Sequence, residues 1–137
     1  MKIVQGPSSV KLASKLSAYM DVPIVKTRTK RFPDGEFYFK FDEDIDGEEL
    51  IIVQSLHPPQ DFHLIELFSI IHTARDLGAE SVKAFVPYLA YSRQGKRYLD
   101  GECISSIMIG EILQNLGSVS YTHLRAHETS LHLVCRL

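Results

Sequence analysis

The stretch Tyr88–Arg97, which reads YLAYSRQGKR, decides the fold through what stands on either side of it. Before it lies Ser81–Val86, a mostly apolar run typical of a strand, and after it comes a helix-like run from about Ser105 to Leu116. This order places the loop at the carboxyl end of a strand, which is where open α/β sheets bind ligands. Three cations within the loop predict an anion-binding site.

Working outward, the same alternation of strand and helix recurs toward the N-terminus. Lys2–Gln5 is a short apolar run, and the turn that follows supplies Ser8 or Ser9 as the N-cap of a helix reaching about Met20. Leu50–Val53 is continuously apolar, as expected for a strand covered on both faces of a parallel sheet. The chain is therefore predicted to have an α/β fold with a mainly parallel sheet flanked by helices.

Three further segments complete the predicted elements. Val22–Thr29 is rich in β-branched residues and is predicted to be a strand, and Phe37–Phe41 alternates as a half-buried strand does. Asp61 is the predicted N-cap of a helix ending at Leu77. The side chains expected to face inward from that helix are Phe62, Ile65, Phe68, Ile71 or His72, and Ala74.

Composition and charge narrow the function classes. The 137 residues are enough for one domain, and 45% hydrophobic with 23% charged residues is typical of a soluble globular protein. A net charge of −2 does not indicate a nucleic-acid binder, and no apolar run approaches the roughly 20 residues of a membrane span. Cys103 and Cys135 stand far apart without metal spacing, so a reduced, cytoplasmic protein is expected.

Four short motifs stand in register along residues 1 to about 117. They are Arg31–Glu36 (RFPDGE), Ile52–Ser55 (IVQS), Tyr91–Gln94 (YSRQ) and Ile104–Ser106 (ISS). In this order and at these separations the chain resembles the N-terminal half of the ribose-phosphate pyrophosphokinases, also called phosphoribosyl pyrophosphate synthetases. The resemblance implies a phosphoribosyltransferase-like N-terminal domain that carries a β flag hairpin.

The loop residues Arg93 and Gln94 match the family's Arg-Gln pair, which contacts the phosphates of ATP. The resemblance therefore implies an ATP-binding role for both. Without it, the residues leave two interpretations open, phosphate binding and a solvated basic loop. Lys96 and Arg97 lie close enough in the sequence to assist.

The turn Phe32–Glu36 also has two interpretations. Pro-Asp-Gly is a common turn sequence between two strands. In the family this turn is the flag at the subunit boundary, where the aromatic stacks on adenine and two acids read its edge for a neighbouring protomer. The resemblance thus implies ATP-binding roles for Phe32, Asp34 and Glu36, together with Gly35 of the same turn, and a homo-oligomer.

The implied activity is transfer of the pyrophosphoryl group of ATP to ribose 5-phosphate, with Mg²⁺ as cofactor. The family's second half, which holds most of the ribose 5-phosphate site and the catalytic residues, has no counterpart in these residues, so the fragment alone is expected to be inactive. An alternative within the same resemblance is a non-catalytic associated subunit that acts as a binding module. A phosphoribosyltransferase proper is disfavoured because no acidic pair precedes a Thr-Gly loop.

From Ser118 the sequence loses the expected pattern. The resemblance calls for an apolar strand ending in Asp-x-His, whose His helps to hold magnesium. His127 falls on that His by spacing, but Arg125 stands where the Asp belongs, and a cation there would repel the metal. We therefore assign no metal ligand, divide the chain into the ATP-side domain 1–117 and a tail 118–137, and expect the tail to be non-native sequence.

Overall fold

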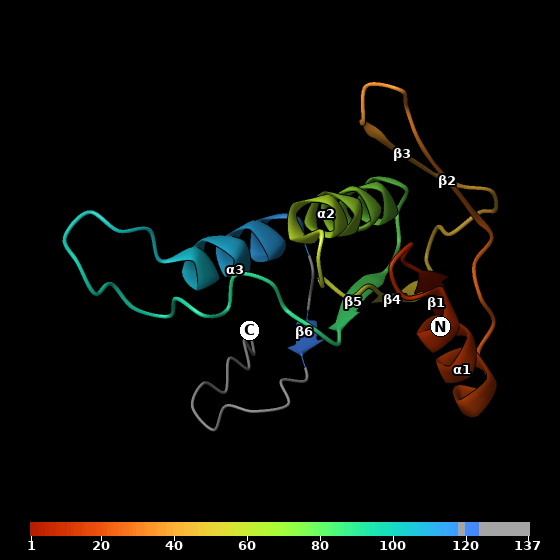
Figure 1. Cartoon of the computed structure of the whole chain (residues 1–137). Coiled ribbons are helices and arrows are strands. Elements are labelled where there is room, and N and C mark those ends of the chain that lie inside the picture. Colours follow the sequence, from red (N-terminus) through yellow and green to blue (C-terminus); the bar gives the residue numbers. More distant parts are fainter. Residues whose placement is uncertain (118–119, 124–137) are drawn as a thin grey trace.

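The computed structural model describes residues 1–117 and 120–123. Its centre is a four-stranded sheet in which every neighbouring pair is parallel (Figure 1). The strand order is β1-β4-β5-β6, with bounds Lys2–Gln5, Glu49–Val53, Ser81–Val86 and Ser120–His123. The predicted α/β fold with a mainly parallel sheet is confirmed.

Three helices cover the two faces of this sheet. Helix α1 (Val10–Met20) packs against one face through Ala13, next to Ile3 and Val53. Helices α2 (Gln60–Asp76) and α3 (Ser105–Asn115) pack against the other face. Because β4 lies in the middle, its side chains alternate between the layers: Leu50 and Ile52 face α2, whereas Val53 faces α1. This explains why the sequence of β4 is apolar throughout.

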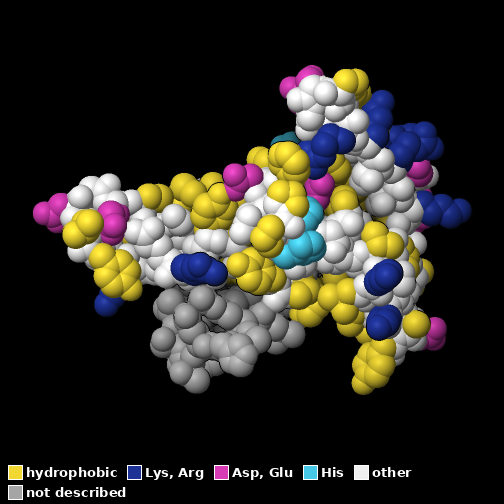
Figure 2. All heavy atoms as spheres, in the orientation of Figure 1, with side chains coloured by type: hydrophobic (Ala, Val, Ile, Leu, Met, Phe, Trp, Pro, Cys, Tyr) yellow, Lys and Arg dark blue, Asp and Glu magenta, His cyan; other side chains and the backbone are white. Residues whose placement is uncertain are grey.

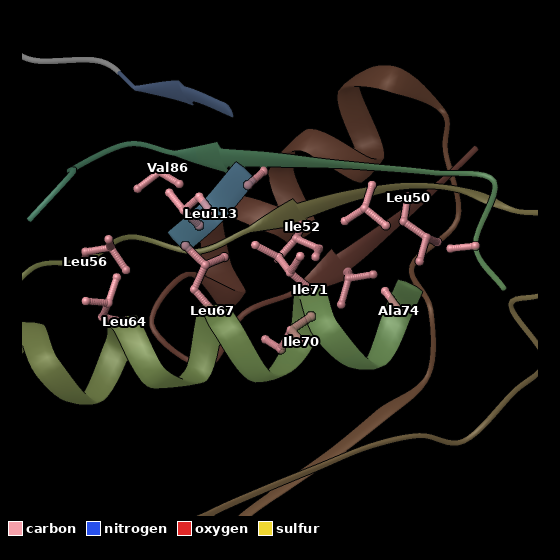
Figure 3. Packing of buried hydrophobic residues seen from close by; sticks show 14 of the residues in the cluster. Leu50, Ile52, Leu56, Leu64, Leu67, Ile70, Ile71, Ala74, Val86 and Leu113 are labelled. Atoms are coloured by element: carbon pink, nitrogen blue, oxygen red, sulfur yellow. The ribbon is translucent and has the colours of Figure 1, made fainter. Parts of the chain in front are cut away.

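The larger core lies between α2 and the sheet (Figure 3). Leu67 and Ile71 of α2 are fully buried against Ile52 of β4, and Leu113 of α3 closes the same layer. Burying one such side chain stabilises the fold by about 1.5–3 kcal/mol. This layer fixes α2 relative to the strand ends.

The predicted inward face of α2 is only partly right. Ile71 and Ala74 are buried, but Phe62 is 51% exposed and Ile65 is 54% exposed. The helix also begins two residues earlier than predicted, with Pro59 rather than Asp61 as its N-cap. Apolar side chains occur on several sides of this helix, so their spacing does not decide which side meets the sheet.

An antiparallel hairpin leaves the sheet between β1 and β4. Strand β2 (Thr27–Arg31) pairs with β3 (Phe37–Phe41), and the backbone N–H of Asp42 donates to the carbonyl of Lys26 at 2.9 Å to close the neck. The predicted strand Val22–Thr29 is therefore wrong as a single element. Its first part runs beside β1, where Ile24 makes one parallel bridge to Ile3, and its last part belongs to the hairpin.

Within residues 1–117 and 120–123, no helix is long and apolar enough to cross a lipid bilayer. Strand β6 lies beside β5 where a fifth apolar strand was expected. Apart from this strand, the segment predicted to be a non-native tail lies outside the described residues, as do Arg125, His127 and Cys135.

Candidate functional site

The cationic loop begins where β5 ends, as predicted. The carbonyl of Tyr88 accepts a hydrogen bond from the backbone N–H of Leu56 at 2.9 Å, so the loop starts beside the residues that follow β4. Ala90 is buried and anchors this first part to the core. The loop therefore leaves the carboxyl edge of the sheet from a fixed position.

Glu102 organises the rest of the loop from within. Its Oε2 accepts hydrogen bonds from the backbone N–H groups of Leu99 and Tyr98, both at 3.0 Å, and from Nε2 of Gln94 at 3.3 Å. These bonds, with those from Leu99 and Tyr98 largest, lower the pKa of the Glu102 carboxyl below its ordinary value. Sequence analysis did not predict this role, although an acid three residues before the start of α3 is the signal that could have revealed it.

The loop cations are used differently. Nε of Arg97 donates to the carbonyl of Glu102 at 2.9 Å, and Lys96 lies 5.0 Å above the ring centre of Tyr98, so both help to hold the loop together. Arg93 is exposed, and within the described part of the chain its guanidinium has no hydrogen bond or ion pair. Of these three, Arg93 is the cation left available for an anion.

The backbone under Arg93 is nevertheless fixed. The carbonyl of Gln94 accepts hydrogen bonds from Oγ of Ser106 at 3.0 Å and from its backbone N–H at 3.4 Å, which joins the loop to the first turn of α3. On the other side, the Tyr91 hydroxyl donates to the Asp61 carboxylate at the start of α2. That bond is the main reason why the pKa of Tyr91 is raised above its ordinary value.

The second predicted part of the site is the turn between β2 and β3. The backbone N–H of Phe32 donates to the carbonyl of Glu36 at 2.8 Å, and Gly35 adopts φ 96°, a left-handed conformation that favours glycine. Oδ1 of Asp34 accepts from the backbone N–H of Glu36 at 3.1 Å. The turn interpretation is thus confirmed, and it presents Phe32 at 39% exposure with the carboxylate of Glu36 also exposed.

The Phe32 ring is positioned by its neighbours on the hairpin. It meets the ring of Tyr38 edge-on at 6.1 Å between centroids, and Nζ of Lys30 lies 4.5 Å from its centre. Other cations gather along the same hairpin (Figure 2), where Arg28 and Lys40 each pair with Asp42 at 3.2 Å. These cations lie on a solvent-exposed strand pair that also carries acids.

The two predicted parts do not meet within one copy of the chain. The hairpin tip lies at the upper right of Figure 1, and the loop between β5 and α3 extends to the far left, with α2 between them. Phe32, Asp34, Gly35 and Glu36 share one turn, and Arg93 is next to Gln94 in the loop. Within the described residues, no hydrogen bond, ion pair or ring contact joins the two groups.

A hollow that sequence analysis did not predict lies at the carboxyl edge of the sheet. Ile24 lies on one side of β1 and β4 on the other, so the order of strands reverses between β1 and β4. At such a reversal, crevices open in α/β sheets. The hollow has a volume of about 490 Å³, and its polar lining includes Ser8, Lys11 and His57.

No group of three His, Cys, Asp or Glu side chains within the described ranges is placed to hold a metal ion. The Glu102 carboxylate in the loop is already engaged by backbone N–H donors. The described residues therefore provide no protein ligand set for the Mg²⁺ implied by the family resemblance.

Comparison with known proteins identifies the family. A family model described as the N-terminal domain of ribose phosphate pyrophosphokinase matches residues 1–117. The ribose-phosphate pyrophosphokinase of Saccharolobus solfataricus is 48% identical over 117 residues, covering 85% of this chain and 40% of that protein. The protein of the same name from Methanobrevibacter smithii is 37% identical over 126 residues, covering 92% of this chain and 42% of that protein.

A solved structure shows the same fold. The crystal structure of phosphoribosylpyrophosphate synthetase from Mycobacterium smegmatis matches with a TM-score of 0.88 at 24% identity, over 93% of this chain and 43% of that chain. The chain spans about two fifths of the length of the curated relatives it matches. Because the family model covers 117 of the 137 residues, the chain belongs to the ribose-phosphate pyrophosphokinase family, an enzyme family whose N-terminal domain it contains.

Proposed function

We propose that this domain binds ATP, with the phosphates at Arg93 and Gln94 of one copy and the adenine at Phe32, Asp34, Gly35 and Glu36 of a second copy. The observation that carries the proposal is the exposed guanidinium of Arg93, which has no partner among the described residues and stands on a braced loop at the carboxyl edge of the sheet. The separation of turn and loop within one copy supports a site shared by two copies.

The side chains suit the chemistry of the ligand. A guanidinium forms paired, charge-assisted hydrogen bonds to phosphate oxygens, and the Gln94 side chain offers further hydrogen-bonding groups. Adenine has an apolar face, which can stack on the Phe32 ring, and an amino group, which can donate to the carboxylates of Asp34 or Glu36. A stacked base gains about 1–3 kcal/mol.

In the whole enzyme, we propose that the bound ATP gives its pyrophosphoryl group to ribose 5-phosphate. Catalysis of this kind rests on positioning and on the neutralisation of phosphate charge. Mg²⁺ belongs to the proposal as the partner of the nucleotide phosphates. The chain covers 40% of its S. solfataricus relative. The proposal puts the ribose 5-phosphate site mainly in the remaining part of the enzyme, and we therefore expect the chain alone to be inactive. The proposal places the protein in the cytoplasm, where an exposed thiol such as Cys103 stays reduced.

The test is calorimetric titration of the 137-residue chain with ATP. Losing one charge-assisted bond costs about 1.5–3 kcal/mol, so Arg93→Ala should weaken ATP binding roughly tenfold to a hundredfold. Lys15→Ala is the matched control, because Lys15 is an exposed cation on α1, away from both parts of the site. It should leave ATP affinity unchanged.

Two outcomes would contradict the proposal. One is a wild-type chain that does not bind ATP, and the other is an Arg93→Ala variant with wild-type affinity. Circular dichroism of both variants should match the wild type, since neither side chain is part of the core.

A further inference from the structure

Glu66 is a carboxylate on the buried side of α2. Its side chain is 7% exposed, in a helix whose other buried residues, such as Leu67 and Ile70, are apolar. A carboxylate in such a place is unfavourable unless its oxygens are paired. Both are: Oε1 accepts from Nη2 of Arg31 at 2.8 Å, and Oε2 accepts from Nε2 of Gln54 at 2.9 Å.

Arg31, the last residue of β2, links Glu66 to the turn. While Nη2 donates to Glu66, Nη1 donates to the carbonyl of Gly35 at 2.9 Å. The guanidinium also lies 4.5 Å from the ring centre of Phe62 and 5.8 Å from that of Phe37. The planar guanidinium of Arg31, held by these contacts, therefore joins α2 to the middle of the turn.

Gln54, directly after β4, holds Glu66 from the other side. Its side chain is fully buried, and its Oε1 accepts hydrogen bonds from the backbone N–H of Ser8 at 3.1 Å and from the Ser8 hydroxyl at 2.8 Å. Its Nε2 also donates to the carbonyl of His63 at 3.2 Å. The carboxylate of Glu66 is therefore fixed to the sheet edge and to the segment between β1 and α1.

We infer that Glu66 is a positioning residue for ATP binding: through Arg31 it holds the turn Phe32–Glu36 in the orientation that receives adenine. The inference rests on the proposed function. A contribution to stability alone would not require a charge here, because apolar side chains of similar volume often replace buried ion pairs without loss of stability. What the pair adds is orientation, since the turn stands on a hairpin that projects from the sheet (Figure 1).

The test compares two ligands on the wild-type chain and on Glu66→Gln. ATP needs both the loop and the turn, whereas inorganic tripolyphosphate offers only phosphates to the loop. Glu66→Gln should weaken ATP binding roughly tenfold, which is the scale of a lost base stack, and should leave tripolyphosphate binding unchanged. Glu80→Gln is the matched control, because Glu80 is exposed directly before β5, and it should change neither affinity.

A second variant keeps the inference testable if Glu66→Gln does not fold. Arg31→Lys keeps a cation beside Glu66 but cannot donate in two directions with a rigid fork. It should give the same selective loss of ATP affinity at a melting temperature close to that of the wild type. The amide ¹⁵N relaxation of Gly35 provides a readout without ligand: in both variants its order parameter should fall, while that of Leu67 in the core should not.

The outcomes separate this inference from the proposed function. If the wild-type chain binds neither ligand, the proposed function fails, whereas the relaxation of Gly35 still tests the mechanical link. If the wild type binds both and the folded variants retain wild-type ATP affinity, the positioning role is overturned. Equal loss of both ligands would also overturn it, because it would indicate a general effect on the domain.

Discussion

At the scale of single residues, the charged groups of the loop divide into those that brace it and those, such as Arg93, that have no partner among the described residues. Glu102 accepts from two backbone N–H groups and from Gln94, and Arg97 donates to the Glu102 carbonyl. Arg93 stands beyond these bonds and meets solvent. A loop braced by its own carboxylate can hold an unpaired cation without a ligand to order it.

The pH dependence of the loop follows from Glu102. Its pKa is lowered in the folded chain, so its stabilising effect is complete above the ordinary glutamate pKa of about 4.3 and is lost as the pH falls through the lower folded value. The amide resonances of Tyr98 and Leu99 should therefore shift with an inflection below about pH 4.3. The measurement is an acid titration of ¹⁵N-labelled protein.

Glu102→Gln is the control for this titration and should remove the inflection at both amides. An inflection at or above the ordinary glutamate pKa would show that the hydrogen bonds do not favour the charged carboxylate. The resonance of Leu67 should stay unchanged over the same range, which shows that the core remains folded.

What the sequence could predict at this scale was local. Arg93 and Gln94 follow a recognisable strand, so their place at the carboxyl end could be predicted. The use of Glu102 could not, because it depends on how the chain folds back over eight residues to Gln94.

At the scale of elements, α2 presents two apolar sides with different roles. Leu67 is fully buried against the sheet, whereas Ile65 is 54% exposed on the other side of the helix. Phe62, which is 51% exposed and lies one turn before Glu66, receives the guanidinium of Arg31. The helix therefore serves both the core and the hairpin.

Alanine substitutions should separate the two sides of α2. Leu67→Ala should lower the free energy of unfolding by about 2–5 kcal/mol, because it leaves a cavity in the core. Ile65→Ala should change it by less than about 0.5 kcal/mol. Urea denaturation measures both, and equal losses would mean that the side assigned to the core is wrong.

The positions of the strands and helices were largely predictable from the sequence, but which elements and faces pack against one another was not. β4 and β5 have apolar patterns that specify strands by themselves. Two features depend on tertiary contacts, which local periodicity does not contain: the side of α2 that meets the sheet, and the division of Val22–Thr29 between a segment beside β1 and the hairpin.

At the scale of the whole molecule, the separation of turn and loop predicts that two copies must associate to form a complete ATP site. If two copies share each ATP site, Phe32→Ala destroys one half of the site and Arg93→Ala the other. Each variant alone should bind ATP weakly. An equimolar mixture should bind ATP more tightly than either, because the intact loop of a Phe32→Ala copy can meet the intact turn of an Arg93→Ala copy. Titration of the mixture with ATP is the measurement.

A mixture no better than its components would contradict the shared site, provided that sedimentation shows that the two variants associate. Wild-type affinity should also increase with protein concentration over the range in which the copies associate. A single copy that binds ATP equally well at every concentration would contradict the same idea.

At this scale, the hydrogen-bond network around Glu66 could not be predicted from the sequence. Ser8, Arg31, Gln54 and Glu66 contact one another across separations of up to 46 residues. Each is a common polar residue in an unremarkable setting, and only the fold shows that they form a continuous chain of hydrogen bonds.

The hairpin also has a consequence for protein engineering. Its two strands leave and return at a closed neck, where the N–H of Asp42 meets the Lys26 carbonyl, so the sheet itself places no limit on how many residue pairs the hairpin contains. Deleting two residues from each strand would keep every side chain on its original face, yet it would draw Arg31 about 7 Å toward the neck and away from Glu66. The length of this hairpin therefore suits the contact of Arg31 with Glu66 as well as the packing of Phe39 and Phe41 against the core.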